Sequence, residues 1–213
     1  MSLDVKICGL SDAQSVAAVV DAGARYAGFL FCPEARRRVN AETAASLMKG
    51  LPASIITVGL FVNPSNEEIT HVLFAAPLQM IQLHGEETPE RVHAVRTLTG
   101  LPVMKAIGIA DMRDIENARR YETTADMLLF DAKSPAGGNR GGNGIAFNWN
   151  LLAHESFAKP WMLAGGLNET NLADAVRATG ARIVDVSSGV EDGPGCKNPA
   201  KIASFIAAAK RIE

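Results

Sequence analysis

Two glycine-containing turns near the end of the sequence have the pattern of an anion-binding site. Each follows a short apolar run, residues 161–164 in the first case and 181–186 in the second. Glycine lets backbone N–H groups approach a ligand closely, and a helix N-terminus adds unpaired N–H groups and a positive dipole end. Either turn alone is better explained as an ordinary strand-to-helix connection, but the pair predicts a cradle for a phosphate group. Its expected members are Gly165, Gly166, Asp185, Ser187, Ser188 and Gly189.

Cys8 ends a short apolar run and has the chemistry of a base. Side chains alternate along a strand, so Cys8 and Lys6 are expected to share a face. A nearby ammonium group and backbone amides would favour the thiolate, which accepts protons. The alternative is that Cys8 is a small buried hydrophobic residue, as free cysteines most often are.

Asp131 ends the apolar run 127–131 and has the chemistry of an acid. A carboxylate in apolar surroundings is costly unless it is paired or used in function. A buried carboxyl that keeps its proton near neutral pH could serve as a general acid. An ion pair with Lys133 or an arginine, or a cap on the following turn, explains Asp131 equally well.

Arg36, Arg37 and Arg38 follow the second apolar run. A planar guanidinium can hold a substrate carboxylate with two hydrogen bonds, whereas an ordinary run of charges is simply solvated. At most one or two of three adjacent side chains can face a common site, and we expect the others to lie in solvent.

Other polar stretches are interpreted as structural. His84 has no cysteine or acidic partner at a metal spacing, so we expect a hydrogen-bonded structural histidine, followed by Glu86 and Glu87 as charges at a helix N-terminus. The glycine-rich segment 134–144 lacks the Lys-Ser/Thr ending of a nucleotide-binding loop. We interpret it as a flap over the site that excludes water, with Gly142 and Gly144 touching the substrate.

The elements that must position these residues alternate between strand and helix. Apolar runs bounded by glycine recur eight times, and Ser11, Ser65 and Asn168 are placed to begin helices. Such alternation implies a parallel sheet, and eight units imply closure into a barrel rather than an open doubly wound sheet. We therefore expect one α/β domain, residues 1–213, folded as a parallel eight-stranded (β/α)8 TIM barrel. Its active site is expected at the C-terminal face of the strands.

Composition excludes several classes of function. A net charge of −2 gives no footprint for nucleic acid or a basic membrane face, and no apolar run is long enough to span a bilayer. The N-terminus shows no signal peptide. The three cysteines form neither a disulfide framework nor a metal spacing, which favours a cytoplasmic protein without a metal.

Seven motifs, in order along residues 5–197, resemble the phosphoribosylanthranilate isomerase family. The motifs are residues 6–9, 58–63, 82–87, 131–133, 141–144, 164–168 and 184–191. The sequence departs from the family pattern in carrying Asn148 and Asn198 where aspartate is usual, and in an extra Gly-Gly-Asn-Arg after Asp131. These departures concern loops and helix starts, where asparagine is a fair substitute.

The resemblance implies a barrel enzyme of tryptophan biosynthesis that needs no cofactor or metal. It would convert N-(5-phosphoribosyl)anthranilate to 1-(2-carboxyphenylamino)-1-deoxyribulose 5-phosphate by an Amadori rearrangement. By the family pattern, Asp131 protonates the ribose ring oxygen, Cys8 removes the C2 proton of the resulting Schiff base, and Arg37 binds the anthranilate carboxylate.

Two other functions are compatible with a phosphate cradle. Another phosphate-binding barrel, such as indoleglycerol-phosphate synthase, would rely on a catalytic lysine and glutamates; Lys6 and Lys105 are present, but the acid–base pair is Cys8 and Asp131. A non-catalytic phosphosugar-binding barrel would not need that pair. A second isomerase activity of histidine biosynthesis stays open. The expected partner is a small phosphorylated molecule, and the expected state is a monomer or homodimer.

Overall fold

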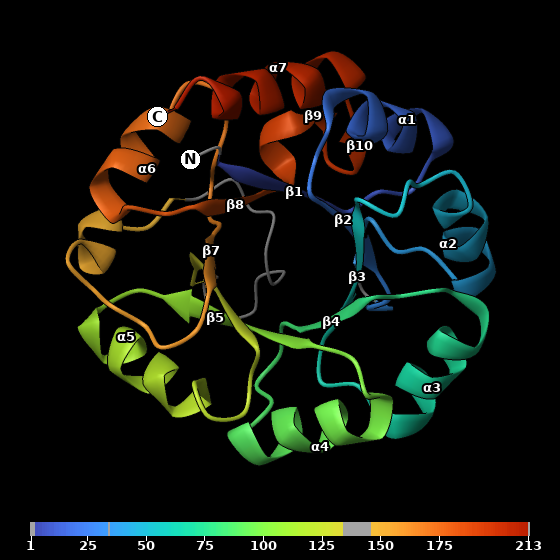
Figure 1. Ribbon diagram of the computed structural model, residues 1–213, viewed down its shortest axis with the longest axis horizontal. Helices are drawn as coiled ribbons and strands as arrows, with labels where there is room; N and C mark the ends of the chain where they lie inside the picture. The colour runs from blue at the N-terminus through green and yellow to red at the C-terminus, as the bar shows by residue number, and fades with distance from the viewer. Residues whose placement is uncertain (1–2, 34, 134–145, 213) are drawn as a thin grey trace.

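The strands close into a barrel (Figure 1). The computed structural model describes residues 3–33, 35–133 and 146–212. Each barrel strand pairs in parallel with the next along the chain, and β8 pairs with β1, so the expected (β/α)8 TIM barrel is confirmed. The strands are β1 (Asp4–Cys8), β2 (Tyr26–Leu30), β3 (Ile56–Phe61), β4 (Met80–Leu83), β5 (Val103–Ile109), β6 (Met127–Ala132), β7 (Trp161–Leu163) and β8 (Ile183–Val186).

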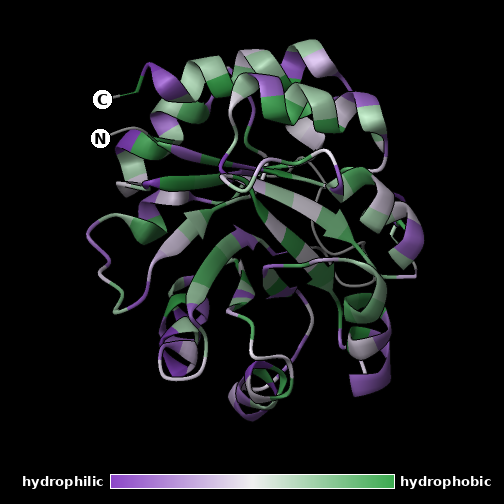
Figure 2. Ribbon diagram, turned by 45° about the vertical axis from the view of Figure 1, so that its right-hand side comes forward, coloured by the Kyte–Doolittle hydropathy of each residue, from purple (hydrophilic) through white to green (hydrophobic). Residues whose placement is uncertain are grey.

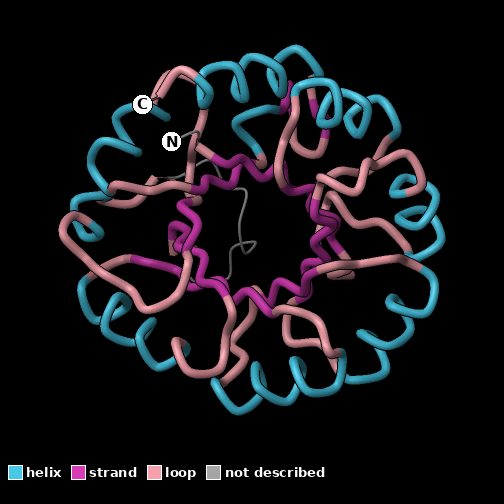
Figure 3. The backbone as a smooth tube through the Cα atoms, in the orientation of Figure 1, coloured by secondary structure: helices cyan, strands magenta, loops and turns pink. Residues whose placement is uncertain are grey.

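Helices form a ring outside the strands (Figure 3). Between β6 and β7 the described residues contain only the 3-10 turn η2 (Trp149–Leu152), and β8 is followed by the 3-10 turn η3 (Ser188–Val190) and a hairpin of β9 (Glu191–Gly193) and β10 (Cys196–Lys197). Within the described ranges, none of the helices is long and apolar enough to cross a membrane. The helices are α1 (Ala13–Ala22), α2 (Ala41–Met48), α3 (Asn66–Ala75), α4 (Pro89–Thr99), α5 (Met112–Ala118), the 3-10 turn η1 (Arg119–Tyr121), α6 (Leu172–Thr179) and α7 (Pro199–Lys210).

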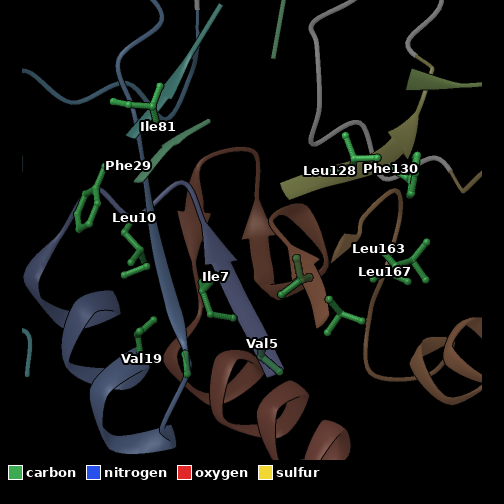
Figure 4. Close-up of a cluster of buried hydrophobic side chains, with 14 of the residues drawn as sticks. Val5, Ile7, Leu10, Val19, Phe29, Ile81, Leu128, Phe130, Leu163 and Leu167 are labelled. Atoms are coloured by element: carbon green, nitrogen blue, oxygen red, sulfur yellow. The ribbon is translucent and has the colours of Figure 1, made fainter. Parts of the chain in front are cut away.

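The hydrophobic core has two layers because strand side chains alternate between the barrel interior and the helices. The outer layer fills the space between strands and helices; Ile7, Phe29 and Leu128 are examples (Figure 4). Apolar residues are concentrated on the strands, whereas hydrophilic residues recur along the helices (Figure 2). The inner layer fills the barrel itself and includes Tyr26, Val58, Met80, Met104, Leu129 and Met162.

Helix starts follow local capping chemistry, with two corrections to the sequence analysis. Ser65 caps α3 as expected, accepting a hydrogen bond from the Glu68 N–H. The cap of α1 is Asp12 rather than Ser11. Asn168 does not begin α6, because its Oδ1 accepts hydrogen bonds from the Thr170 and Asn171 N–H groups and forms a turn; the helix starts after Asn171.

Candidate active site

The predicted catalytic residues lie at the carboxyl ends of barrel strands. Cys8 is the last residue of β1, and Asp131 is near the end of β6; both are buried. The glycine turns after β7 and β8 come to the same end of the barrel, since all eight strands run parallel. The Ser187 hydroxyl donates to the Cys8 carbonyl at 3.0 Å, which links the turn after β8 to Cys8. Gly165 lies close to Asp131, because a Cβ atom added to Gly165 would be 3.3 Å from Asp131 Oδ1.

Asp131 is held by its own strand end and faces a histidine. Its Oδ1 accepts a 2.8 Å hydrogen bond from the Ala132 N–H, and its Oδ2 lies 3.4 Å from His84 Nε2. Lys133 pairs instead with Asp114 at 2.9 Å. The ion pair with Lys133 that the sequence left open is therefore not formed, and the partner of Asp131 is a side chain from the β4 end.

His84 makes the hydrogen bond expected of a structural histidine, and that bond directs it at Asp131. Its Nδ1 lies 3.1 Å from Gln82 Nε2, and Gln82 is fully buried inside the barrel. With Nδ1 as acceptor, the ring hydrogen sits on Nε2 and points toward Asp131. The Gln82 Oε1 has no hydrogen-bond partner within the described part of the chain.

Cys8 lies beside a buried ion pair. The Lys6 ammonium is 2.9 Å from Asp185 Oδ1, and Lys6 has no solvent exposure. Burial lowers the pKa of Lys6, but Asp185 and Cys8 raise it above its ordinary value overall. Burial also raises the pKa of the Cys8 thiol, and Lys6 opposes this only in part. Burial therefore opposes the thiolate, which the sequence left open beside the alternative of a small buried thiol.

The two glycine turns are packed against each other. Gly165 and Gly166 both have positive φ, 87° and 65°, which other residues rarely adopt. A Cβ atom on Gly189 would collide with the Leu167 carbonyl oxygen, so only glycine fits where the two turns meet. The turn η3 begins at Ser188, directly after β8. The start of a helical turn leaves N–H groups without intrahelical partners, which suits an anion.

Among the three consecutive arginines, Arg37 alone turns inward. Arg36 and Arg38 are exposed, whereas Arg37 is partly buried and its side chain covers Gly9, the residue after Cys8. The Arg37 Nε and Nη2 atoms bind the two carboxylate oxygens of Glu191 at 2.6 and 2.7 Å. Arg37 is thus the inward-facing arginine of the three, and it is already paired with a carboxylate of the protein.

A buried charge network at the β4 end was missed by the sequence analysis. Glu87 is not a helix-terminal charge: it pairs with Lys105 at 2.9 Å and accepts hydrogen bonds from the Asn63 and Gly85 N–H groups. Both side chains are almost fully buried. The available signal was Lys105 itself, since a lysine in the apolar run 101–107 requires a buried partner.

Two further expectations concern the glycine-rich flap and a metal site. Gly142 and Gly144, with the proposed flap, lie outside the described residues. Across residues 3–33, 35–133 and 146–212, no cluster of three or more histidine, cysteine or acidic side chains is arranged to hold a metal ion.

Comparisons with known proteins agree on one family. The family model described as N-(5'phosphoribosyl)anthranilate (PRA) isomerase matches residues 5–208. The chain is similar to the N-(5'-phosphoribosyl)anthranilate isomerase of Rhodospirillum centenum, with 53% identity over 100% of both chains. It is also similar to that of Paracoccus denitrificans, with 54% identity over 98% of both.

Solved structures of phosphoribosyl anthranilate isomerases superpose closely on this chain. Phosphoribosyl anthranilate isomerase from Thermotoga maritima gives a TM-score of 0.86 at 36% identity over 98% of both chains. A phosphoribosyl anthranilate isomerase in complex with reduced 1-(o-carboxyphenylamino)-1-deoxyribulose 5-phosphate gives 0.81 at 33% identity, again over 98% of both.

Proposed function

Because the chain belongs to the N-(5'-phosphoribosyl)anthranilate isomerase family, we propose that Cys8 and Asp131 act on the sugar of its substrate. The protein is an isomerase of tryptophan biosynthesis that converts N-(5-phosphoribosyl)anthranilate to 1-(2-carboxyphenylamino)-1-deoxyribulose 5-phosphate. The observation that supports these roles is the placement of a thiol at the end of β1 and a carboxyl at the end of β6, at the same end of the barrel as the glycine turns after β7 and β8.

Asp131 supplies the first proton. It donates to the ribose ring oxygen, the bond between that oxygen and C1 breaks, and the anthranilate nitrogen and C1 become a cationic Schiff base. Asp131 is left as a carboxylate, with His84 Nε2 at 3.4 Å to stabilise it. The hydrogen bond from the Ala132 N–H keeps the carboxyl oriented during the transfer.

Cys8 accepts the second proton. The cationic Schiff base acidifies the C2 hydrogen and lowers the cost of a nearby thiolate, which offsets the burial that keeps the free thiol neutral. The thiol first gives its proton to solvent, and the thiolate then removes this hydrogen, so that the electron pair of the C2–H bond forms an enolamine. The enolamine becomes the ketone product as C1 takes a proton and the C2 hydroxyl releases one. Lys6, fixed by Asp185 at 2.9 Å, is a permanent cation beside Cys8.

The two ends of the substrate are held by different groups. The backbone N–H groups around Gly165, Gly166 and η3 bind the phosphate, with Ser187 and Ser188 at the same turn. Arg37 binds the anthranilate carboxylate. Fixing both ends places C1 and C2 of the sugar between the acid and the base, which is where orientation contributes most to rate.

Assembly and location stay predictions. A solved structure describes monomers generated from the dimeric isomerase of Thermotoga maritima, so a monomer and a homodimer are both compatible with this family. A cytoplasmic location is expected for this chain from its cysteine usage.

The direct test is to add N-(5-phosphoribosyl)anthranilate to the purified protein and follow the loss of its fluorescence. We expect turnover, with a double variant, Cys8→Ser and Asp131→Asn, as the inactive control. A wild-type protein that binds the compound without converting it would be a phosphosugar-binding barrel and would refute the enzymatic roles.

A further inference from the structure

The β9–β10 hairpin holds a buried carboxylate between two cations. Glu191 and Lys197 face each other across the two strands, and their side chains are 2.6 Å apart. Glu191 also receives both hydrogen bonds from Arg37 and one from the Gly195 N–H at 3.0 Å. The side chains of Glu191 and Lys197 are 3% and 0% exposed. Arg37 is thus bound to a rigid support rather than to solvent.

Within the described part of the chain, Glu191 is the hydrogen-bond acceptor of the Arg37 side chain, which leaves one edge of the guanidinium available. A guanidinium carries five N–H groups, and Glu191 accepts from Nε and Nη2 on one edge. The opposite edge, formed by Nη1 and the second Nη2 hydrogen, has the geometry to hold a second carboxylate with two hydrogen bonds. A free arginine would have to be ordered on binding, whereas this one is already ordered.

The charges of the cluster match a single substrate carboxylate. Arg37 and Lys197 are two cations and Glu191 is one anion, which leaves one net positive charge beside β1. Without Glu191, the two cations Arg37 and Lys197 would have no anion between them, and Arg37 would be loosely held. Without Lys197 the carboxylate would neutralise Arg37 and reduce its attraction for another anion.

The hairpin is also linked to the proposed base through Ser187. Lys197 Nζ donates to the Ser187 carbonyl and hydroxyl oxygens at 3.0 and 3.2 Å, and Ser187 in turn donates to the Cys8 carbonyl. One connected set of hydrogen bonds therefore fixes the arginine, the turn after β8 and the end of β1 relative to each other.

We propose that Glu191 and Lys197 are positioning residues that orient Arg37 toward the aromatic carboxylate of the substrate and set its net charge. This inference rests on the proposed carboxylate-binding role of Arg37. It assigns the hairpin to recognition of the anthranilate end, separate from the phosphate end held by the glycine turns.

Binding measurements on Glu191→Gln test the proposal without relying on turnover. The probes are reduced 1-(o-carboxyphenylamino)-1-deoxyribulose 5-phosphate, which carries both anions, and ribulose 5-phosphate, which lacks the carboxylate. We expect affinity for the first to fall about tenfold to a hundredfold, as for a displaced binding group, and affinity for the second to change less than about twofold. Asp192→Asn is the matched control, because Asp192 is exposed in the same hairpin and pairs with Lys201.

Three results would overturn the proposal: unchanged affinity for the first probe, equal loss for both probes, or the same loss when Arg37→Ala is already present. If Glu191→Gln does not fold, the variant Glu191→Gln/Lys197→Met removes both charges and takes its place. Failure of both to fold would assign the pair a structural role instead. A wild-type protein that binds the first probe but does not turn over the substrate would refute the catalytic roles and leave this inference standing.

Discussion

Replacing Asp131 with asparagine removes the proposed acid while keeping its shape. Asparagine can retain the carbonyl oxygen that accepts from the Ala132 N–H at 2.8 Å. Its amide can donate to His84 Nε2 once the ring hydrogen moves to Nδ1, where the Gln82 side-chain amide, turned over, accepts it through Oε1. The fold and the hydrogen bonds around position 131 should therefore survive, and the variant loses only the ability to donate a proton to the sugar.

The size of the effect follows from that single loss. General acid catalysis by a positioned side chain contributes about 10²-fold to 10⁴-fold, which corresponds to about 3 to 5 kcal/mol in the activation free energy. Substrate binding uses the glycine turns and Arg37 rather than Asp131. We expect kcat to fall by this factor and KM to change little.

Steady-state fluorescence assays of Asp131→Asn and wild type, with circular dichroism to verify folding, measure the difference. His84→Asn is the informative comparison, because it removes only the group that faces Asp131 Oδ2 and should cost less than the loss of the acid itself. A folded Asp131→Asn variant that keeps more than about a tenth of wild-type kcat would refute the assignment of Asp131 as general acid.

Three further predictions concern other parts of the molecule. Because burial raises the pKa of Cys8, kcat of the wild type should increase as the pH is raised above neutral. The variant Cys8→Ser should lose this increase, and its kcat should be lower by ~10²-fold or more. Glu87→Gln should lower the free energy of unfolding in urea by about 3 to 5 kcal/mol, because the buried Lys105 ammonium loses the Glu87 carboxylate and keeps backbone carbonyls as acceptors. The double variant Glu87→Gln/Lys105→Met should recover most of that loss, and a single variant as stable as wild type contradicts this. Although burial raises the pKa of Glu191, hydrogen bonds from Arg37 and Lys197 lower it to about 2, against 4.5 ordinarily. The ionised Glu191 therefore stabilises the folded state above about pH 5, and this stabilisation, at most about 3 kcal/mol, is lost as the pH falls toward 2. The unfolding free energy of Glu191→Gln should lack this pH dependence when it is measured between pH 5 and 2.

The architecture could be predicted from sequence because its signals are local and repeated. Apolar runs bounded by glycine mark strands. Ser65 marks a helix start through a hydrogen bond within three residues, and Pro89 marks another because its fixed φ suits the first helical position. The same locality explains the error at Asn168, whose side chain satisfied nearby N–H groups in a turn instead of at a helix start. Both outcomes use one kind of hydrogen bond, so the sequence alone does not separate them.

The candidate site was predicted in part, because its residues pair across the whole chain. The positions of Cys8 and Asp131 at strand ends follow from the strand pattern. Their partners do not: Arg37 binds Glu191, which is 154 positions away, and Lys6 binds Asp185, which is 179 positions away. Such pairs depend on barrel closure and on hairpin geometry, which no local spacing encodes.

The buried ion pairs at this end of the barrel are better explained by chemistry than by stability. A buried pair such as Lys6–Asp185 adds little net stability, because removing both charges from water costs as much as their attraction returns. An apolar pair would fill the same space, but it would remove the fixed Lys6 cation that favours a Cys8 thiolate. The groups that must respond to developing charge are thus already charged and oriented before the substrate arrives, so little reorganisation is needed during the reaction. The barrel interior supplies the stability, through apolar residues such as Met104 on β5 and Leu129 on β6. The strand ends can therefore carry charges that a purely structural core would exclude.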